Sequence, residues 1–107
     1  MSRIKVSGKA YIHYTLKEFK IPFEVEHQFS KKRKFRFDFY FELDGKKYGI
    51  EYDGLFAGKS RHTTVGGFSR DTEKTNLAAL DGFIVLRYTA MTYKNFYTDL
   101  RLLLNIK

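Results

Sequence analysis

The sequence of 107 residues contains no cysteine, no tryptophan and a single proline. Without cysteine, the chain has no disulfide scaffold, no thiol nucleophile and no thiolate metal site. Its apolar runs are all shorter than the roughly 18 residues that a membrane-spanning helix needs, and no apolar signal-peptide block follows the first residues. These absences lead us to expect a soluble protein without a membrane partner, most simply in the cytoplasm.

Acidic residues are scarce relative to basic ones. The chain has 20 Lys and Arg against 12 Asp and Glu, which gives a formal net charge of +8. This excess of positive charge on a short chain favours a polyanionic partner, of which nucleic acid is the first candidate. The alternative is a basic surface that is simply solvated. The aromatic fraction of 18% argues against disorder. The length predicts one domain, residues 1–107.

Hydrophobic periodicity predicts an α/β chain with the element order α-β-β-β-α-β-α. We expect Pro22 to stop the first helix, Ser69 to cap the second, Gly82 to end it, and Thr92 to cap the third. The apolar run 83–89 is typical of a buried central strand. A loop with four glycines, 54–67, is long enough to be functional. The expected helices and strands, in chain order, are 8–20, 23–29, 35–43, 46–53, 70–81, 83–89 and 93–104.

Strict alternation in the two central strands predicts an apolar and a polar face. The apolar face is expected to carry Phe35, Phe37, Phe39, Phe41, Tyr48, Ile50 and Tyr52. The polar face is expected to carry Arg36, Asp38, Tyr40, Glu42, Gly49, Glu51 and Asp53.

Asp44 and Gly45 predict a two-residue hairpin turn between these strands. Counting back from that turn sets Asp38 opposite Glu51 in a non-hydrogen-bonded pair, with Cα atoms about 4.5 Å apart. Facing carboxylates repel each other unless they are solvated, share a proton or bind a cation. Mg²⁺ suits such oxygen ligands, and Asp53 lies on the same face. The alternative is a solvated face in which Asp38 pairs with Arg36 or a loop lysine.

A metal between carboxylates on a basic protein favours phosphodiester hydrolysis. Such a site also needs a cation for the developing charge and a base or a group that positions water. Lys74 shares the expected sheet-facing side of its helix with Leu77 and Ala78. His62, in the glycine-rich loop, is a candidate phosphate ligand or base. Both residues also fit ordinary surface positions.

Two other kinds of site are excluded. The stretch 54–60 imitates a phosphate-binding loop but has three residues between its glycines where that motif needs four. The three histidines, His13, His27 and His62, lack zinc-site spacing.

Five short segments together resemble the PD-(D/E)XK nuclease superfamily. They read RFDF at 36–39, IEYDG at 50–54, RHT at 61–63, FSRDTEKTN at 68–76 and GFIVLRYT at 82–89. The nearest resemblance is to the small branch akin to very-short-patch repair endonucleases, which includes phage-borne and homing-type enzymes. The segments keep the family's order over residues 8 to 104.

The resemblance implies a Mg²⁺- or Mn²⁺-dependent DNA endonuclease, a phosphodiester hydrolase, with a mixed central sheet flanked by helices. Its two acidic metal ligands fall on Asp38 and Glu51, the pair that the hairpin count gives independently. Asp53 stands where the family has its lysine, and Lys74 is the natural replacement. In the first helix, where the family often carries a glutamate, Glu18 is the available one.

The resemblance also raises the weight of His62, because Arg61–His62–Thr63 looks like the loop motif of this branch. We therefore expect catalytic roles for Asp38, Glu51, Lys74 and His62, with Asp53 assisting the metal. The expected substrate is branched, mismatched or site-specific DNA, encountered in the host cytoplasm if the enzyme is phage-borne. The residues expected to contact DNA are Lys31, Lys32, Arg33, Lys34, Arg36, Lys59 and Arg61.

A domain this small often needs a twofold partner to cut both strands, which makes a homodimer one of the arrangements the sequence allows. The alternative to an enzyme is a non-catalytic nucleic-acid-binding module of nuclease-like fold. In that hypothesis the basic residues 31–36 bind the phosphate backbone, and exposed Tyr40 or Phe56 stacks on unpaired bases.

Overall fold

The helices and strands follow one another in the predicted order. A computed structural model describes residues 7–30, 33–54 and 65–106. Its elements are α1 (Gly8–Glu18), β1 (Glu24–Ser30), β2 (Phe35–Leu43), β3 (Lys46–Asp53), α2 (Val65–Leu80), β4 (Phe83–Thr89) and α3 (Asn95–Leu103). The α/β class and the element order are thereby confirmed. Within these described ranges, no helix is both long enough and apolar enough to cross a membrane.

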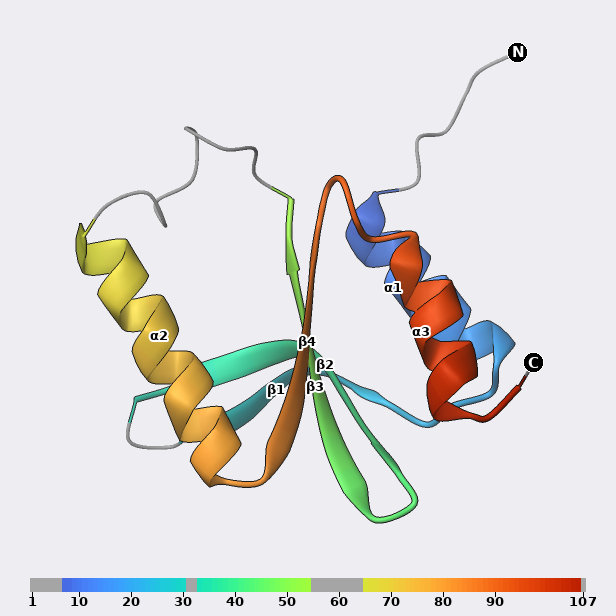
Figure 1. Ribbon diagram of the computed structural model, residues 1–107, viewed down its shortest axis with the longest axis horizontal. Coiled ribbons are helices and arrows are strands. Elements are labelled where there is room, and N and C mark those ends of the chain that lie inside the picture. Colours follow the sequence, from blue (N-terminus) through green and yellow to red (C-terminus); the bar gives the residue numbers. More distant parts are fainter. Residues whose placement is uncertain (1–6, 31–32, 55–64, 107) are drawn as a thin grey trace.

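The four strands form one mixed sheet in the order β1-β2-β3-β4. The β1–β2 and β2–β3 pairs are antiparallel, and β3 and β4 are parallel. A parallel pair needs a crossover connection, which here contains α2. Figure 1 shows α2 on one side of the sheet and α1 with α3 on the other.

The prediction that residues 83–89 form a central strand is wrong, because β4 pairs only with β3 and lies at an edge. Its apolar sequence has a different cause. Phe83 and Val85 pack toward α2, whereas Leu86 and Tyr88 join the core beneath α1 and α3. A strand covered by helices on both faces needs apolar residues on both, even at the edge of a sheet.

The larger core lies between the sheet and the α1–α3 pair. Its ten buried residues are Ile12, Leu16, Ile21, Phe39, Phe41, Tyr48, Ile50, Tyr88, Phe96 and Leu100. On the opposite face, beneath α2, the buried cluster among the residues whose burial is described has four members: Phe37, Tyr40, Ala78 and Phe83. The sheet therefore has one strongly apolar face and one that leaves room for polar side chains.

Strand β2 does not keep the strict alternation that the sequence predicts. Phe39 and Phe41 lie in the larger core, but Phe37 packs with Tyr40 on the α2 side. The pairing of β1 with β2 passes from Val25↔Phe39 to His27↔Phe37 and skips Glu26 and Asp38. Glu26 has a φ of +53°, in the left-handed region. The register itself is unchanged across this gap and shifts further along β1, between Gln28 and Ser30.

Gly49 explains why the Phe37 ring fits on the α2 side of the sheet. A Cβ atom at this position would lie 2.5 Å from the Phe37 ring, which is closer than real Cβ atoms approach. The ring therefore occupies the space that a side chain on β3 would otherwise fill. The predictions that Phe37 shares a face with Phe39 and that Tyr40 is exposed are both wrong.

Two predicted helix caps also differ from the structure. Helix α2 begins at Val65, one turn before Ser69, so Ser69 lies inside the helix. Its early glycines fall in the first turn, where few helical hydrogen bonds depend on them. Thr92 accepts a hydrogen bond from Thr89 N at 2.9 Å and closes the turn after β4, while α3 starts behind Lys94. The helix end at Gly82, with φ +85°, is as predicted.

Candidate functional site

The hairpin between β2 and β3 has the register that the sequence predicts. Asp44 and Gly45 form the turn with positive φ, and the ladder runs from Leu43↔Lys46 to Phe39↔Ile50. The ladder ends there, so the predicted pairing of Asp38 with Glu51 is not among its pairs. The Asp38 carboxylate accepts a hydrogen bond from Tyr52 N at 2.7 Å. Beyond Phe39, the β3 backbone N–H of Tyr52 therefore donates to the Asp38 side chain and not to a backbone carbonyl.

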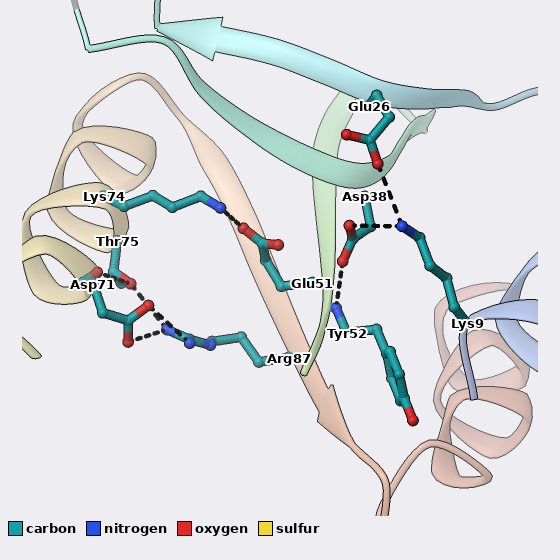
Figure 2. Close-up of polar contacts among 9 residues, drawn as sticks. All are labelled: Lys9, Glu26, Asp38, Glu51, Tyr52, Asp71, Lys74, Thr75 and Arg87. Atoms are coloured by element: carbon teal, nitrogen blue, oxygen red, sulfur yellow. Dashed lines mark hydrogen bonds and ion pairs between the residues drawn. The ribbon is translucent and has the colours of Figure 1, made fainter. Parts of the chain in front are cut away.

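Glu51 points from β3 toward α2, where its Oε1 atom contacts Lys74 Nζ (Figure 2). The side chains are only 18% and 24% exposed, respectively. Among the described residues, this buried Oε1 has no hydrogen bond of normal geometry and depends on the ion pair. The structure thus sets Lys74 on the sheet-facing side of its helix, as the spacing to Leu77 and Ala78 predicts.

The pKa of Lys74 is lowered from its ordinary value, chiefly because burial penalises its charged form. The carboxylate of Asp38 opposes this effect, and the guanidinium of Arg87 adds to it. Lys74 is therefore a partly desolvated cation whose charge acts more strongly on its neighbours than that of a surface lysine.

Lys9, in the first turn of α1, reaches Asp38 from the other side of the sheet edge (Figure 2). Its Nζ atom lies 3.3 Å from Asp38 Oδ1 and 3.4 Å from Glu26 Oε2. Burial lowers the pKa of Lys9, but the two carboxylates outweigh this effect and the net pKa is raised. Lys9 is the Asp38 partner that sequence reasoning missed in favour of Arg36 or a loop lysine.

Arg87 forms the opposite wall of the site. Its guanidinium donates to both carboxylate oxygens of Asp71, at 2.8 and 2.9 Å, and more weakly to Thr75 Oγ1 at 3.4 Å. This two-point contact fixes the plane of the guanidinium group. The sequence held one signal for it, since Arg87 is the only charged residue in the otherwise apolar run 83–89.

A pocket of about 490 Å³ lies between α2 and the carboxyl ends of β3 and β4, and its lining does not include Lys9. Its charged lining is evenly divided between four basic and four acidic side chains. The basic ones are Arg36, Arg70, Lys74 and Arg87, and the acidic ones are Asp38, Glu51, Asp53 and Asp71. The pocket therefore brings together Asp38, Glu51, Asp53, Lys74 and Arg36 from the predicted set.

Other predicted residues lie elsewhere. Arg33 pairs with Glu73 at 3.0 Å, and its guanidinium lies over the Phe35 ring. Lys34 is exposed in the turn before β2. Glu18 ends α1, about 15 Å along the helix from its first residue, so it is remote from the Lys9 end. Lys31, Lys32, Phe56, Lys59, Arg61 and His62 lie outside the described residues.

Tyr40 is buried and cannot serve as the exposed stacking platform of the binding-module hypothesis. Its hydroxyl donates to Glu42, and its ring stacks on His27 with centroids 4.2 Å apart. Burial, together with the bond to Glu42, raises the pKa of Tyr40 to about 12. The side chain thus joins β1 to β2 instead of facing a ligand.

The donor set limits what metal the pocket fits. In the described part of the chain, no three His, Cys, Asp or Glu side chains lie close enough to hold an ion together. Asp38 and Glu51 still offer carboxylate oxygens, of which Oε1 of Glu51 contacts Lys74 and Oδ1 of Asp38 contacts Lys9. Mg²⁺ typically uses one or two carboxylates and completes its shell with water and phosphate oxygens, so the pair fits it. Asp53 lines the same pocket from the end of β3.

Comparison with protein-family models, with curated proteins and with solved structures finds no match for this chain. The resemblance to PD-(D/E)XK nucleases therefore stays a prediction from the sequence. A functional assignment depends on the residues of the pocket and on their chemistry.

Proposed function

We propose that the protein is a metal-dependent DNA endonuclease of the PD-(D/E)XK kind. One observation carries the proposal: carboxylates from adjacent strands and a partly buried lysine from α2 meet in one pocket with three arginines. Carboxylates, a lysine and arginines are the groups that metal-assisted phosphodiester hydrolysis requires. The net charge of +8 supports a nucleic-acid substrate.

Asp38 and Glu51 would hold Mg²⁺ or Mn²⁺, which when bound polarises the phosphoryl oxygen and lowers the pKa of the attacking water. Lys74 contacts Glu51 and would stabilise the negative charge that develops on the phosphoryl group. Arg36 and Arg70 would take the flanking phosphates. Arg87, held in plane by Asp71, would present a fixed donor edge toward the same backbone.

The test is cleavage of a labelled DNA panel: plasmid, linear duplex, mismatched duplex and four-way junction, each with Mg²⁺, Mn²⁺ or EDTA. Three variants remove one group each: Asp38→Asn, Glu51→Gln and Lys74→Met. We expect each to lose cleavage by about 100-fold or more while retaining DNA binding. The matched control is Asp44→Asn in the hairpin turn, where asparagine tolerates the positive φ.

Two results would overturn the proposal: cleavage that survives EDTA, or equal cleavage by the wild type and all three variants, which would identify a contaminating nuclease. The DNA that is cut fastest would name the substrate class.

A second candidate function is the non-catalytic nucleic-acid-binding module. It is favoured by the ion pairs of Asp38 with Lys9 and of Glu51 with Lys74, which already neutralise both carboxylates. In that case no DNA is cut with any metal, and wild type and variants bind DNA with the same salt sensitivity.

A further inference from the structure

The two carboxylates of the pocket have different lysine partners. Glu51 pairs with Lys74, whose side chain is 24% exposed, whereas Asp38 pairs with Lys9, whose side chain is 48% exposed. Lys9 comes from α1, on the opposite side of the sheet from α2 (Figure 2). The Lys9 ammonium is therefore the more hydrated of the two, while Asp38, at 19% exposed, is as buried as Glu51 and keeps its charge balanced only if another cation replaces the ammonium.

An ammonium group and a divalent cation cannot share one carboxylate oxygen without strong repulsion. Lys9 Nζ lies 3.3 Å from Asp38 Oδ1, and the other oxygen, Oδ2, already accepts the Tyr52 N–H bond. Both oxygens of Asp38 therefore already have a partner, Oδ1 an ammonium group and Oδ2 a backbone N–H. Any cation that uses Asp38 must compete with Lys9.

Glu26 gives the displaced lysine a second partner. Its Oε2 atom lies 3.4 Å from Lys9 Nζ, so the ammonium keeps a carboxylate when it leaves Asp38. Glu26 holds this position with φ +53°, a conformation that a residue with a Cβ atom rarely adopts, at the point where the β1–β2 pairing skips Asp38. Such strained residues persist where the surrounding structure requires them, often beside functional groups.

We propose that Lys9 is a built-in competitor for the metal at Asp38. Lys9 neutralises this carboxylate in the metal-free protein and withdraws toward Glu26 when a divalent cation is bound. It thereby raises the metal concentration that the site requires. This inference rests on the proposed nuclease function, because it assumes that Asp38 is a metal ligand.

The test measures metal binding directly, without DNA or catalysis. Mn²⁺ is titrated into the full chain, and free Mn²⁺ is counted by its electron paramagnetic resonance signal. Lys9→Met keeps the length of the side chain and removes its charge. Lys17→Met is the matched control, since it removes the same charge from an exposed position near the far end of α1. Thermal unfolding checks that both variants fold, and Lys9→Gln replaces Lys9→Met if the latter does not.

We expect Lys9→Met to bind Mn²⁺ about tenfold more tightly than wild type, and Lys17→Met to stay close to wild type. Binding that appears only in Lys9→Met would support the inference even more strongly. Equal or weaker binding by Lys9→Met, with normal binding by wild type, would overturn the inference and leave the nuclease proposal standing. No Mn²⁺ binding by any variant would overturn both. An equal gain in Mn²⁺ affinity in Lys17→Met would show that the effect comes from the lower net charge alone, and it would also overturn the inference.

Discussion

The two faces of the sheet differ in what they contribute to this small domain. Among the residues whose burial is described, ten core residues lie beneath α1 and α3 and four beneath α2, where eight charged side chains line the pocket. Figure 1 shows α2 over this face and α1 with α3 over the other. Apolar burial stabilises the fold far more reliably than ion pairs do. The comparison indicates that the face beneath α1 and α3 stabilises the fold, whereas the face beneath α2 forms the pocket.

The largest expected loss of stability comes from truncating a buried side chain on the face beneath α1 and α3. Phe96 is fully buried in α3, and Phe96→Ala should lower the free energy of unfolding by about 3–5 kcal/mol. Urea denaturation measures the loss. The neighbouring Tyr97 is 38% exposed, so Tyr97→Ala should cost only about 1 kcal/mol. Equal losses at the two positions would contradict the assignment of the main core to this face.

A smaller effect is expected on the charged face. Lys74→Met leaves the buried Glu51 Oε1 without its cation and should cost about 1–3 kcal/mol. Replacing both partners by methionine should recover most of this loss, because an ion pair of this kind adds little net stability. Urea denaturation of the single and double variants measures both values. A double variant as unstable as the sum of its two single variants would show that the two side chains are not coupled and would contradict this expectation.

The smallest effect concerns alkaline pH. The pKa of Tyr40 is raised to about 12, so the folded protein keeps a proton that the unfolded chain loses above about pH 10. Stability should therefore fall as pH rises from about 10 to 12. Tyr40→Phe should make this fall shallower, and so should Tyr88→Phe on the other face, because burial and a bond to Asp99 also raise the pKa of Tyr88.

Urea denaturation at a series of pH values measures the slope. If stability falls with pH as steeply in Tyr40→Phe as in wild type, the pKa of Tyr40 is not raised by its burial and its bond to Glu42.

Local sequence signals predicted much of this arrangement. The hairpin register followed from Asp44 and Gly45 as far as Phe39↔Ile50, because a two-residue turn fixes the pairs directly behind it. The spacing from Lys74 to Ala78 predicted the inward side of α2, because helical periodicity alone decides it. Both signals act over short distances along the chain.

The remaining features depend on contacts between distant segments, which no local pattern encodes. Lys9 meets Asp38 only because α1 packs against the sheet at that point. The turning of Phe37 toward α2 needs the space above Gly49 on another strand. The edge position of β4 depends on how four strands are ordered, and an apolar run reads the same at an edge as in a centre when helices cover both faces.

The parallel pairing of β3 with β4 has a consequence for how the protein is made. The pocket takes Arg36 and Asp38 from β2 and Arg87 from β4, near the end of the described chain. Parallel strands pair only after the whole crossover between them has been synthesised. We expect a nascent chain that has not yet released β4 from the ribosome to lack both Arg87 and the strand beneath α2. The pocket therefore forms late in synthesis, because an N-terminal fragment that ends before β4 lacks part of the pocket lining.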